Sequence, residues 1–290
     1  MYADYLGFRL ALGAIPNPVW LQGDGKNVRS RVVPHATTST IYEATGTYRS
    51  KLVFRNDMTG NLAYIDYSHG TNAVTEIVDT LDAYHPDISP DGKKVVFCTG
   101  IEGVSGQSAV YVRDLNAEGS NLVRLDVKSA AIPRWRVLAG GDTVIVYVTD
   151  AGNNRNEAGF MAASTWQVKF EGGKFGIPEK LFDGAYHGGI SEDNMLAVSG
   201  ARLLRARVAK SGSDVTRNAV DTLWYGGEQA CNVSLARDSS KRTLFLDFGG
   251  ASGRKFVGRD YGTHEQILVA DASGKLIQSI AAPTGYSFDH

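Results

Sequence analysis

The sequence has 290 residues, enough to bury one large core or two small ones. Hydrophobic residues make up 43% and charged residues 21%, which is ordinary for a globular protein. The formal net charge of −1 provides no basic field for nucleic acid or an anionic membrane surface, and no apolar run approaches the roughly 20 residues of a membrane span. We therefore expect neither a nucleic-acid partner nor a membrane span.

The two cysteines and the first residues bear on the cellular context. Cys98 and Cys231 lack the spacing of metal ligands, so we expect two buried free thiols rather than a disulfide. The opening MYADYLGFRLALG has neither the basic start nor the uninterrupted apolar centre of a signal peptide, so an export signal would lie outside this chain. The last residues, SFDH, stop within an apparent repeat, and we expect a fragment of a longer protein.

Short apolar or alternating segments run along the chain from residue 51, and in the clearest unit, residues 84–125, they are separated by Gly, Asp, Asn and Ser turns without helical periodicity. Residues 51–78 predict three strands. Residues 84–125 predict four, namely YHPDIS, KVVFC after a PDG turn, SAVYVRD and NLVRL. Related segments follow at 132–182, 186–224 and 232–280, and GYSFDH begins another at the end.

Alignment of the opening strands places six residues in one register, at successive gaps of 43 to 58 residues: Tyr42, His85, Ile132, His187, Asn232 and His290. Repeats of about 40–50 residues are typical of four-stranded propeller blades. Residues 1–41 match no whole repeat, and we expect them to complete the blade that the C-terminus begins, which would protect the sheet edges. The sequence therefore predicts a single all-β domain with a β-propeller over 42–290. Six four-stranded antiparallel blades are favoured, and five blades with a packed N-terminal arm are the alternative.

The segment YHPDISPDGKKVVF with the downstream AVYVRDL resembles the TolB-like, WD40-type repeat, whose members form six-bladed β-propellers. The resemblance is specific over 84–115, partial at ISEDNMLAVSG and degenerate elsewhere. It implies that Ile88 and Ile190 pack between blades, with Trp135 as a larger equivalent. It also implies that Asp91 and Gly92 form a hairpin turn.

A shorter resemblance lies at the start of the chain. The phrase YLGFRLALG (5–13) is similar to the last strand of the formylglycine-generating, sulfatase-modifying enzyme domain. Together with TolB-like repeats, it resembles paralogous surface proteins of fibre-degrading gut bacteria. The catalytic cysteines of the enzyme domain are absent here, so the resemblance implies none of its chemistry. The alternative is an amphipathic strand that joins the closing blade.

The aligned histidines are candidate metal ligands. The first strand of each propeller blade lines the central channel, so His85, His187 and His290 would lie on alternate blades of a six-bladed ring. Three imidazoles could hold Zn²⁺ or a similar divalent ion with an open coordination position. Alternatively, each histidine hydrogen-bonds the neighbouring backbone and packs on the preceding aromatic ring.

Carboxylates near the expected channel suggest an enzymatic alternative. Glycoside hydrolases use two carboxyl groups about 5–9.5 Å apart, one as general acid and one as base or nucleophile. The candidates are Asp87, Glu228, Glu43 and Asp289. Alternatively, Asp87 belongs to the repeat consensus, and Glu43 and Glu228 face solvent.

A third set of residues suggests ligand binding. Trp135 between Arg134 and Arg136 could stack on a sugar ring, whereas its alignment with Ile88 favours a position wedged between blades. Tyr42 and Asn232, from the aligned register, complete the predicted ligand-binding set.

These observations favour a binding or scaffolding module for a glycan or a protein partner. The resemblance implies an extracytoplasmic location, whether periplasmic, surface-bound or secreted. The alternative function is a glycoside hydrolase that acts on plant polysaccharide through channel carboxylates, with or without a histidine-bound metal.

Overall fold

The computed structural model describes residues 19–21, 27–29, 34, 36–57, 59–100, 107–152 and 154–288, which form an almost entirely β structure. β1 (Val19–Leu21) pairs with β2 (Asn27–Arg29) in an antiparallel sheet of two strands. The stretch YLGFRLALG and the residues Asp289 and His290 lie outside the described residues. In the part of the chain that is described, no helix is both long and apolar enough to cross a membrane.

Three antiparallel sheets follow along the chain. The first contains β3 (Lys51–Asn56), β4 (Asn61–Asp66) and β5 (Val74–Ile77), with the 3₁₀ turn η1 (Tyr67–His69) after β4. The second contains β6 (Tyr84–Ile88), β7 (Lys94–Cys98), β8 (Val110–Asp114) and β9 (Val123–Arg124). The third contains β10 (Ala131–Val137), β11 (Thr143–Val148), β12 (Ser164–Glu171), β13 (Lys174–Phe175) and β14 (Glu179–Asp183), with helix α3 (Glu157–Ala162) before β12.

The remaining strands form one continuous sheet. Its members are β15 (Gly189–Ile190), β16 (Leu196–Ala209), β17 (Ala219–Leu223), β18 (Gln229–Leu235), β19 (Thr243–Asp247), β20 (Gln266–Ala270) and β21 (Leu276–Ala281), with η3 (Tyr225–Gly227) and α4 (Ala251–Val257) in its connections. An extended strand as long as β16 would span roughly 45 Å. The amide of Ala209 nevertheless donates to the carbonyl of Met195 at 2.9 Å, so β16 folds back on itself as a hairpin.

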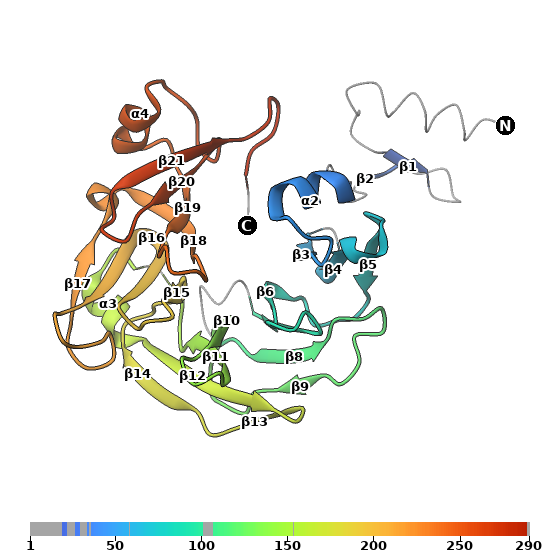
Figure 1. The fold of residues 1–290 in the computed structure, drawn as a ribbon, viewed down its shortest axis with the longest axis horizontal. Coiled ribbons are helices and arrows are strands. Elements are labelled where there is room, and N and C mark those ends of the chain that lie inside the picture. The colour runs from blue at the N-terminus through green and yellow to red at the C-terminus, as the bar shows by residue number, and fades with distance from the viewer. Residues whose placement is uncertain are drawn as a thin grey trace.

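The sheets follow one another around an arc, and β6, β10, β15 and β18 lie on its inner side (Figure 1). The four strands predicted in residues 84–125 are present. Sheets of three, five and seven strands occur beside the four-stranded one, so the described strands do not divide into uniform four-stranded sheets. Side chains at equivalent positions of these inner strands can therefore meet at the centre of the arc.

The prediction that Tyr42 opens an inner strand is wrong. Tyr42 lies in helix α2 (Thr38–Thr45), whose first turn is capped by the Thr37 hydroxyl, which accepts the Thr40 amide at 3.2 Å. The helix ends at Gly46, which has a φ of 71°. A capping threonine and a left-handed glycine are ordinary helix boundaries, and they override the alignment with the later repeats.

A shared backbone irregularity marks the start of three inner strands. The pairing register shifts between Tyr84 and Asp87, between Ala131 and Arg134, and between Cys231 and Ser234. The residues after the first partner, His85, Ile132 and Asn232, have left-handed φ values of 48°, 44° and 52°. Such bulges re-aim the side chains that follow them. The three segments are therefore equivalent in backbone geometry as well as in sequence.

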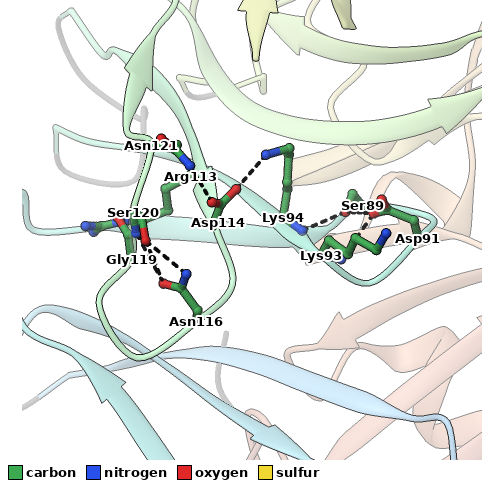
Figure 2. A network of polar contacts seen from close by, with 10 residues as sticks. All are labelled: Ser89, Asp91, Lys93, Lys94, Arg113, Asp114, Asn116, Gly119, Ser120 and Asn121. Carbon is green, nitrogen blue, oxygen red and sulfur yellow. Dashed lines mark hydrogen bonds and ion pairs between the residues drawn. The ribbon is translucent and has the colours of Figure 1, made fainter. Parts of the chain in front are cut away.

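The turn after β6 is held by a small polar network (Figure 2). The Ser89 hydroxyl donates to Asp91 Oδ1 at 2.6 Å and accepts the Lys94 amide at 2.9 Å. Lys94 Nζ reaches Asp114 Oδ1 on β8 at 2.5 Å. The turn after β15 repeats the pattern, because the Ser191 hydroxyl donates to Asp193 at 2.7 Å and accepts the Leu196 amide at 3.0 Å.

The apolar core lies largely between neighbouring sheets. One cluster joins Val96, Cys98, Val110 and Val112 of the second sheet to residues of the third sheet, among them Trp135, Ile145, Tyr147 and Val168. Trp135 is 4% exposed and packs edge-on against Phe170, with ring centroids 6.0 Å apart. The two cysteines form no disulfide; Cys98 is buried and Cys231 is partly exposed. Packing of this kind makes each sheet depend on its neighbour.

The serine of each turn offers a test of the repeat. We expect Ser89→Ala and Ser191→Ala each to lower the free energy of unfolding by about 1–2 kcal/mol, because each change removes a buried hydroxyl, with two hydrogen bonds at Ser89 and three at Ser191. Ser239→Ala, at an exposed serine in the turn after β18, is the matched control and should have little effect. Urea unfolding measures all three, and equal stabilities would contradict the shared role.

Candidate functional site

A cavity of about 250 Å³ lies at one end of the inner strands, between the segments that contain β10, β15 and β18. Trp135 and smaller, mainly apolar residues form most of its wall. Its charged lining residues are Arg134, Arg136, Glu192 and Arg237. Three guanidinium groups thus share one small space with a single lining carboxylate.

The position of the cavity follows from the repeat. Four of its lining residues, each five positions after an aligned residue of the inner strands, are equivalent to one another: Pro90, Val137, Glu192 and Arg237. Equivalent residues of successive inner strands face a common axis. The cavity therefore lies at the mouth of the central channel, and we call it the channel cavity.

Asp87 on β6 joins three inner segments beside this cavity. Its carboxylate accepts the backbone amide of Trp135 at 2.7 Å and forms an ion pair with Arg237. Its carbonyl accepts the Trp135 indole N–H at 3.1 Å. The Asp87 side chain is only 13% exposed, and its charge is balanced from the far side of the channel.

Arg134 occupies the place in β10 that Asp87 has in β6, two residues after the bulge. Its guanidinium forms no ion pair or hydrogen bond with the described residues, and its Nε is buried. Burial lowers the pKa of Arg134, with a further contribution from Arg237, while Asp87 acts in the opposite direction. Arg134 is thus a cation at the cavity wall without a bonded counterion in the described part of the chain.

Arg136 is held more firmly. It is 8% exposed, and its Nη2 donates to the Ser191 carbonyl at 2.7 Å and to Asn194 Oδ1 at 2.6 Å. Burial lowers its pKa, and the nearby charges of Asp193 and Glu192 partly offset that effect. The two bonds come from the turn after β15 and fix the guanidinium between the two segments.

The structure brings His85 and His187 close enough for their charges to interact, each at the start of an inner segment. His187 is 5% exposed, and its Nε2 has no hydrogen-bond partner among the described residues. Burial lowers the pKa of His187 to about 3, assisted by the charges of His85 and Arg134. His187 is therefore a neutral imidazole at physiological pH.

The metal prediction for His85, His187 and His290 stays a prediction, because His290 lies outside the described residues. Within the described ranges, no three His, Cys, Asp or Glu side chains are grouped to hold a metal ion. The charge of Arg134 acts on His187 directly. A second cation beside Arg134 would be repelled, so the surroundings of His187 suit an anion better than Zn²⁺.

The three predicted catalytic carboxylates within the described residues lie on different elements. Glu43 is an exposed residue of helix α2. Glu228 accepts the Ser252 amide at 3.0 Å and the Ser252 hydroxyl at 2.8 Å, which ties it to the start of helix α4. Asp87 is bonded at the channel, and Asp289 lies outside the described residues. Among the described residues, Asp87 and Glu228 share no hydrogen-bond partner that would bring them together. A catalytic pair of carboxylates therefore stays a prediction.

Two of the four predicted ligand-binding residues, Arg134 and Trp135, line the channel cavity. Tyr42 stacks on Tyr48 in the first segment, with ring centroids 4.3 Å apart. Asn232 lies at the bulge of β18. Arg237 is a charged lining residue that the sequence interpretation missed. The alignment could have identified Arg237, because it lies five residues after Asn232, as Pro90 lies five residues after His85 in the clearest repeat.

Comparison with known proteins supports the fold. No known protein family matches the sequence, and no curated protein matches it. A structure of a nidogen/laminin complex is similar at 10% identity with a TM-score of 0.52, over 81% of this chain and 76% of that one. The Dos1 propeller and the hydrazine synthase of Kuenenia stuttgartiensis are 10% and 11% identical, with TM-scores of 0.40 and 0.46. The matches cover 78% and 83% of this chain, and 54% and 65% of the Dos1 and hydrazine synthase chains, respectively. The first likeness supports the β-propeller fold and is too distant to carry more.

The buried His187 predicts a pH dependence of stability. Its pKa lies at about 3 in the folded protein against an ordinary 6.5, so the unfolded chain binds a proton more readily between these values. The free energy of unfolding should therefore fall as the pH drops below about 6.5, by at most about 1.4 kcal/mol per pH unit from this one group. Urea unfolding between pH 7.5 and 4.5 measures the slope.

His187→Asn should reduce that slope relative to the wild type, because it removes the group. His69→Asn, at a histidine whose side chain is 75% exposed, is the control and should retain the wild-type slope. If the free energy of unfolding depends on pH in the same way for the wild type and His187→Asn, then His187 has the same pKa in the folded and unfolded protein, which would contradict the expectation.

Proposed function

We propose that this chain is a β-propeller binding module that holds an anionic group of its ligand in the channel cavity. The observation that carries the proposal is Arg134, a guanidinium at the cavity wall without an ion pair or hydrogen bond among the described residues. A partly desolvated cation without a counterion is unfavourable. A carboxylate in the cavity would supply the missing hydrogen bonds in a charge-assisted form.

The surroundings of Arg134 suit such a ligand. Arg136 and Arg237 line the same cavity, and Arg237 is already paired with Asp87. Trp135 is fixed by two hydrogen bonds to Asp87, so the wall beside Arg134 is rigid. Preorganised groups lose little conformational entropy when a ligand binds.

Finer parts of the proposal rest on sequence. The repeat period and the YHPDISPDG phrase support a TolB-like propeller of six blades, with residues 1–41 in the closing blade. The same resemblance supports an extracytoplasmic location. A binding role for a propeller also accords with the similar structure, in which nidogen is in complex with laminin.

A binding experiment tests the role of Arg134. Glucuronate and glucose differ by one carboxylate, and we expect calorimetry at low salt to detect glucuronate and not glucose. Arg134→Met should weaken glucuronate at least tenfold, about 1.4 kcal/mol. Arg124→Met, at an exposed arginine on β9, is the matched control and should bind as the wild type does.

The stability of Arg134→Met separates binding from architecture. Because the charge is unpaired, we expect Met at this position to leave the free energy of unfolding unchanged or to raise it. A variant that unfolds more readily would identify Arg134 as a structural residue. Equal binding of glucuronate and glucose, or equal binding by both variants, would contradict an anion site.

Glycoside hydrolysis is the alternative prediction, with Asp87 at the channel as its best-placed carboxylate. Binding is favoured over hydrolysis because the Asp87 oxygen Oδ2 is engaged by Trp135 and Arg237. We expect no release of nitrophenol from a panel of nitrophenyl glycosides, with or without EDTA. Turnover that Asp87→Asn abolishes would establish the hydrolase instead.

A further inference from the structure

A second hollow, of about 510 Å³, adjoins the channel cavity and is called here the radial groove. Its walls come from the turn after β10, from β12 and β14, and from the loops after β15 and before β17. β10 is the inner strand of its sheet, whereas β12 and β14 lie further along that sheet. The groove therefore runs outward from the channel between the third sheet and the next.

Arg136 lines both the channel cavity and the radial groove and therefore lies where the two hollows adjoin. Its bonds to Ser191 and Asn194 hold it in place, and Asn194 also lines the groove. The channel cavity alone is smaller than the roughly 300–1,000 Å³ of common ligand sites, and the two together fall within that range.

The two hollows differ in charge. The channel cavity has three arginines and one lining carboxylate. In the groove Gln167 donates to Glu179 at 2.9 Å, and Lys180 forms an ion pair with Asp183 at 2.6 Å. Gln167 Oε1 is buried and has no hydrogen-bond partner among the described residues. Amide and carboxylate groups side by side can both accept from and donate to hydroxyls, which suits a neutral, hydroxyl-rich chain.

We infer that the channel cavity and the radial groove are two subsites for one acidic oligosaccharide. The acidic sugar lies in the channel cavity beside Arg134, and neutral sugars extend past Arg136 into the groove. This inference rests on the proposed function and adds the ligand class and its direction. A glycan is favoured over an acidic peptide because both cations of the groove lining are already bonded, Arg136 to Ser191 and Asn194 and Lys180 to Asp183.

Calorimetry with ligands of increasing length tests the second subsite. The probes are glucuronate, a trisaccharide of glucuronate linked to two neutral sugars, and the neutral disaccharide alone. We expect the trisaccharide to bind at least tenfold more tightly than glucuronate, with the neutral disaccharide weakest. Tetraglutamate serves as the peptide probe, and tighter binding of it than of the trisaccharide would overturn the glycan assignment.

A blocking variant identifies the groove as the place where the neutral sugars bind. Ala139 is an exposed residue of the groove wall, and Ala139→Trp should fill the groove without disturbing the core. We expect it to reduce the affinity for the trisaccharide to that for glucuronate while glucuronate binding is unchanged. Ala117→Trp, at an exposed alanine between β8 and β9, is the matched control and should behave as the wild type.

The outcomes separate the two proposals. At least tenfold weaker binding of glucuronate and the trisaccharide by Arg134→Met, together with loss of only the length effect in Ala139→Trp, supports both. Glucuronate binding that depends on Arg134, with no gain from added sugars or no effect of Ala139→Trp, overturns the second subsite alone. No Arg134-dependent binding of any probe overturns the proposed function and the inference with it.

Discussion

The contacts of Asp87 are the constraint on which the channel depends. One carboxylate accepts the Trp135 amide from the next sheet and pairs with Arg237 from the last, so three segments distant in sequence are joined at one point. Trp135 can then donate its indole N–H to the same residue and pack into the core between two sheets. The position of Arg134, between these anchored groups, follows from that arrangement.

A repeat creates equivalent positions, and divergence among them creates a site. The place after the bulge holds Asp87 in one repeat and Arg134 in the next, and the two differ in charge. Because Arg237 pairs with Asp87, Arg134 has no bonded counterion in the described residues. The same scaffold that fixes the turns therefore places a guanidinium without a bonded partner among the described residues at the channel mouth. Trp135, which packs in the core, thus lies between Arg134 and Arg136 of the proposed site on one strand.

Much of the fold could be predicted from the sequence, because strand periodicity and turn residues are local signals. KVVFC and VYVRD form β7 and β8 as expected, and the alignment of His85, Ile132 and Asn232 coincides with a shared left-handed backbone. Tyr42 could not be placed, because helix capping by Thr37 competes with a weak strand pattern. Arg237 and the joint role of Arg136 depend on pairs formed across the channel, which spacing along the chain does not reveal.

The central claim is that Arg134 receives the anionic group of the ligand. A crystal structure of the protein with the glucuronate-bearing trisaccharide tests it most directly. The account predicts a carboxylate oxygen within about 3.2 Å of the Arg134 guanidinium, with the neutral sugars extending past Arg136 toward Gln167. A carboxylate that points to solvent, or a ligand bound on another face of the propeller, would contradict the account.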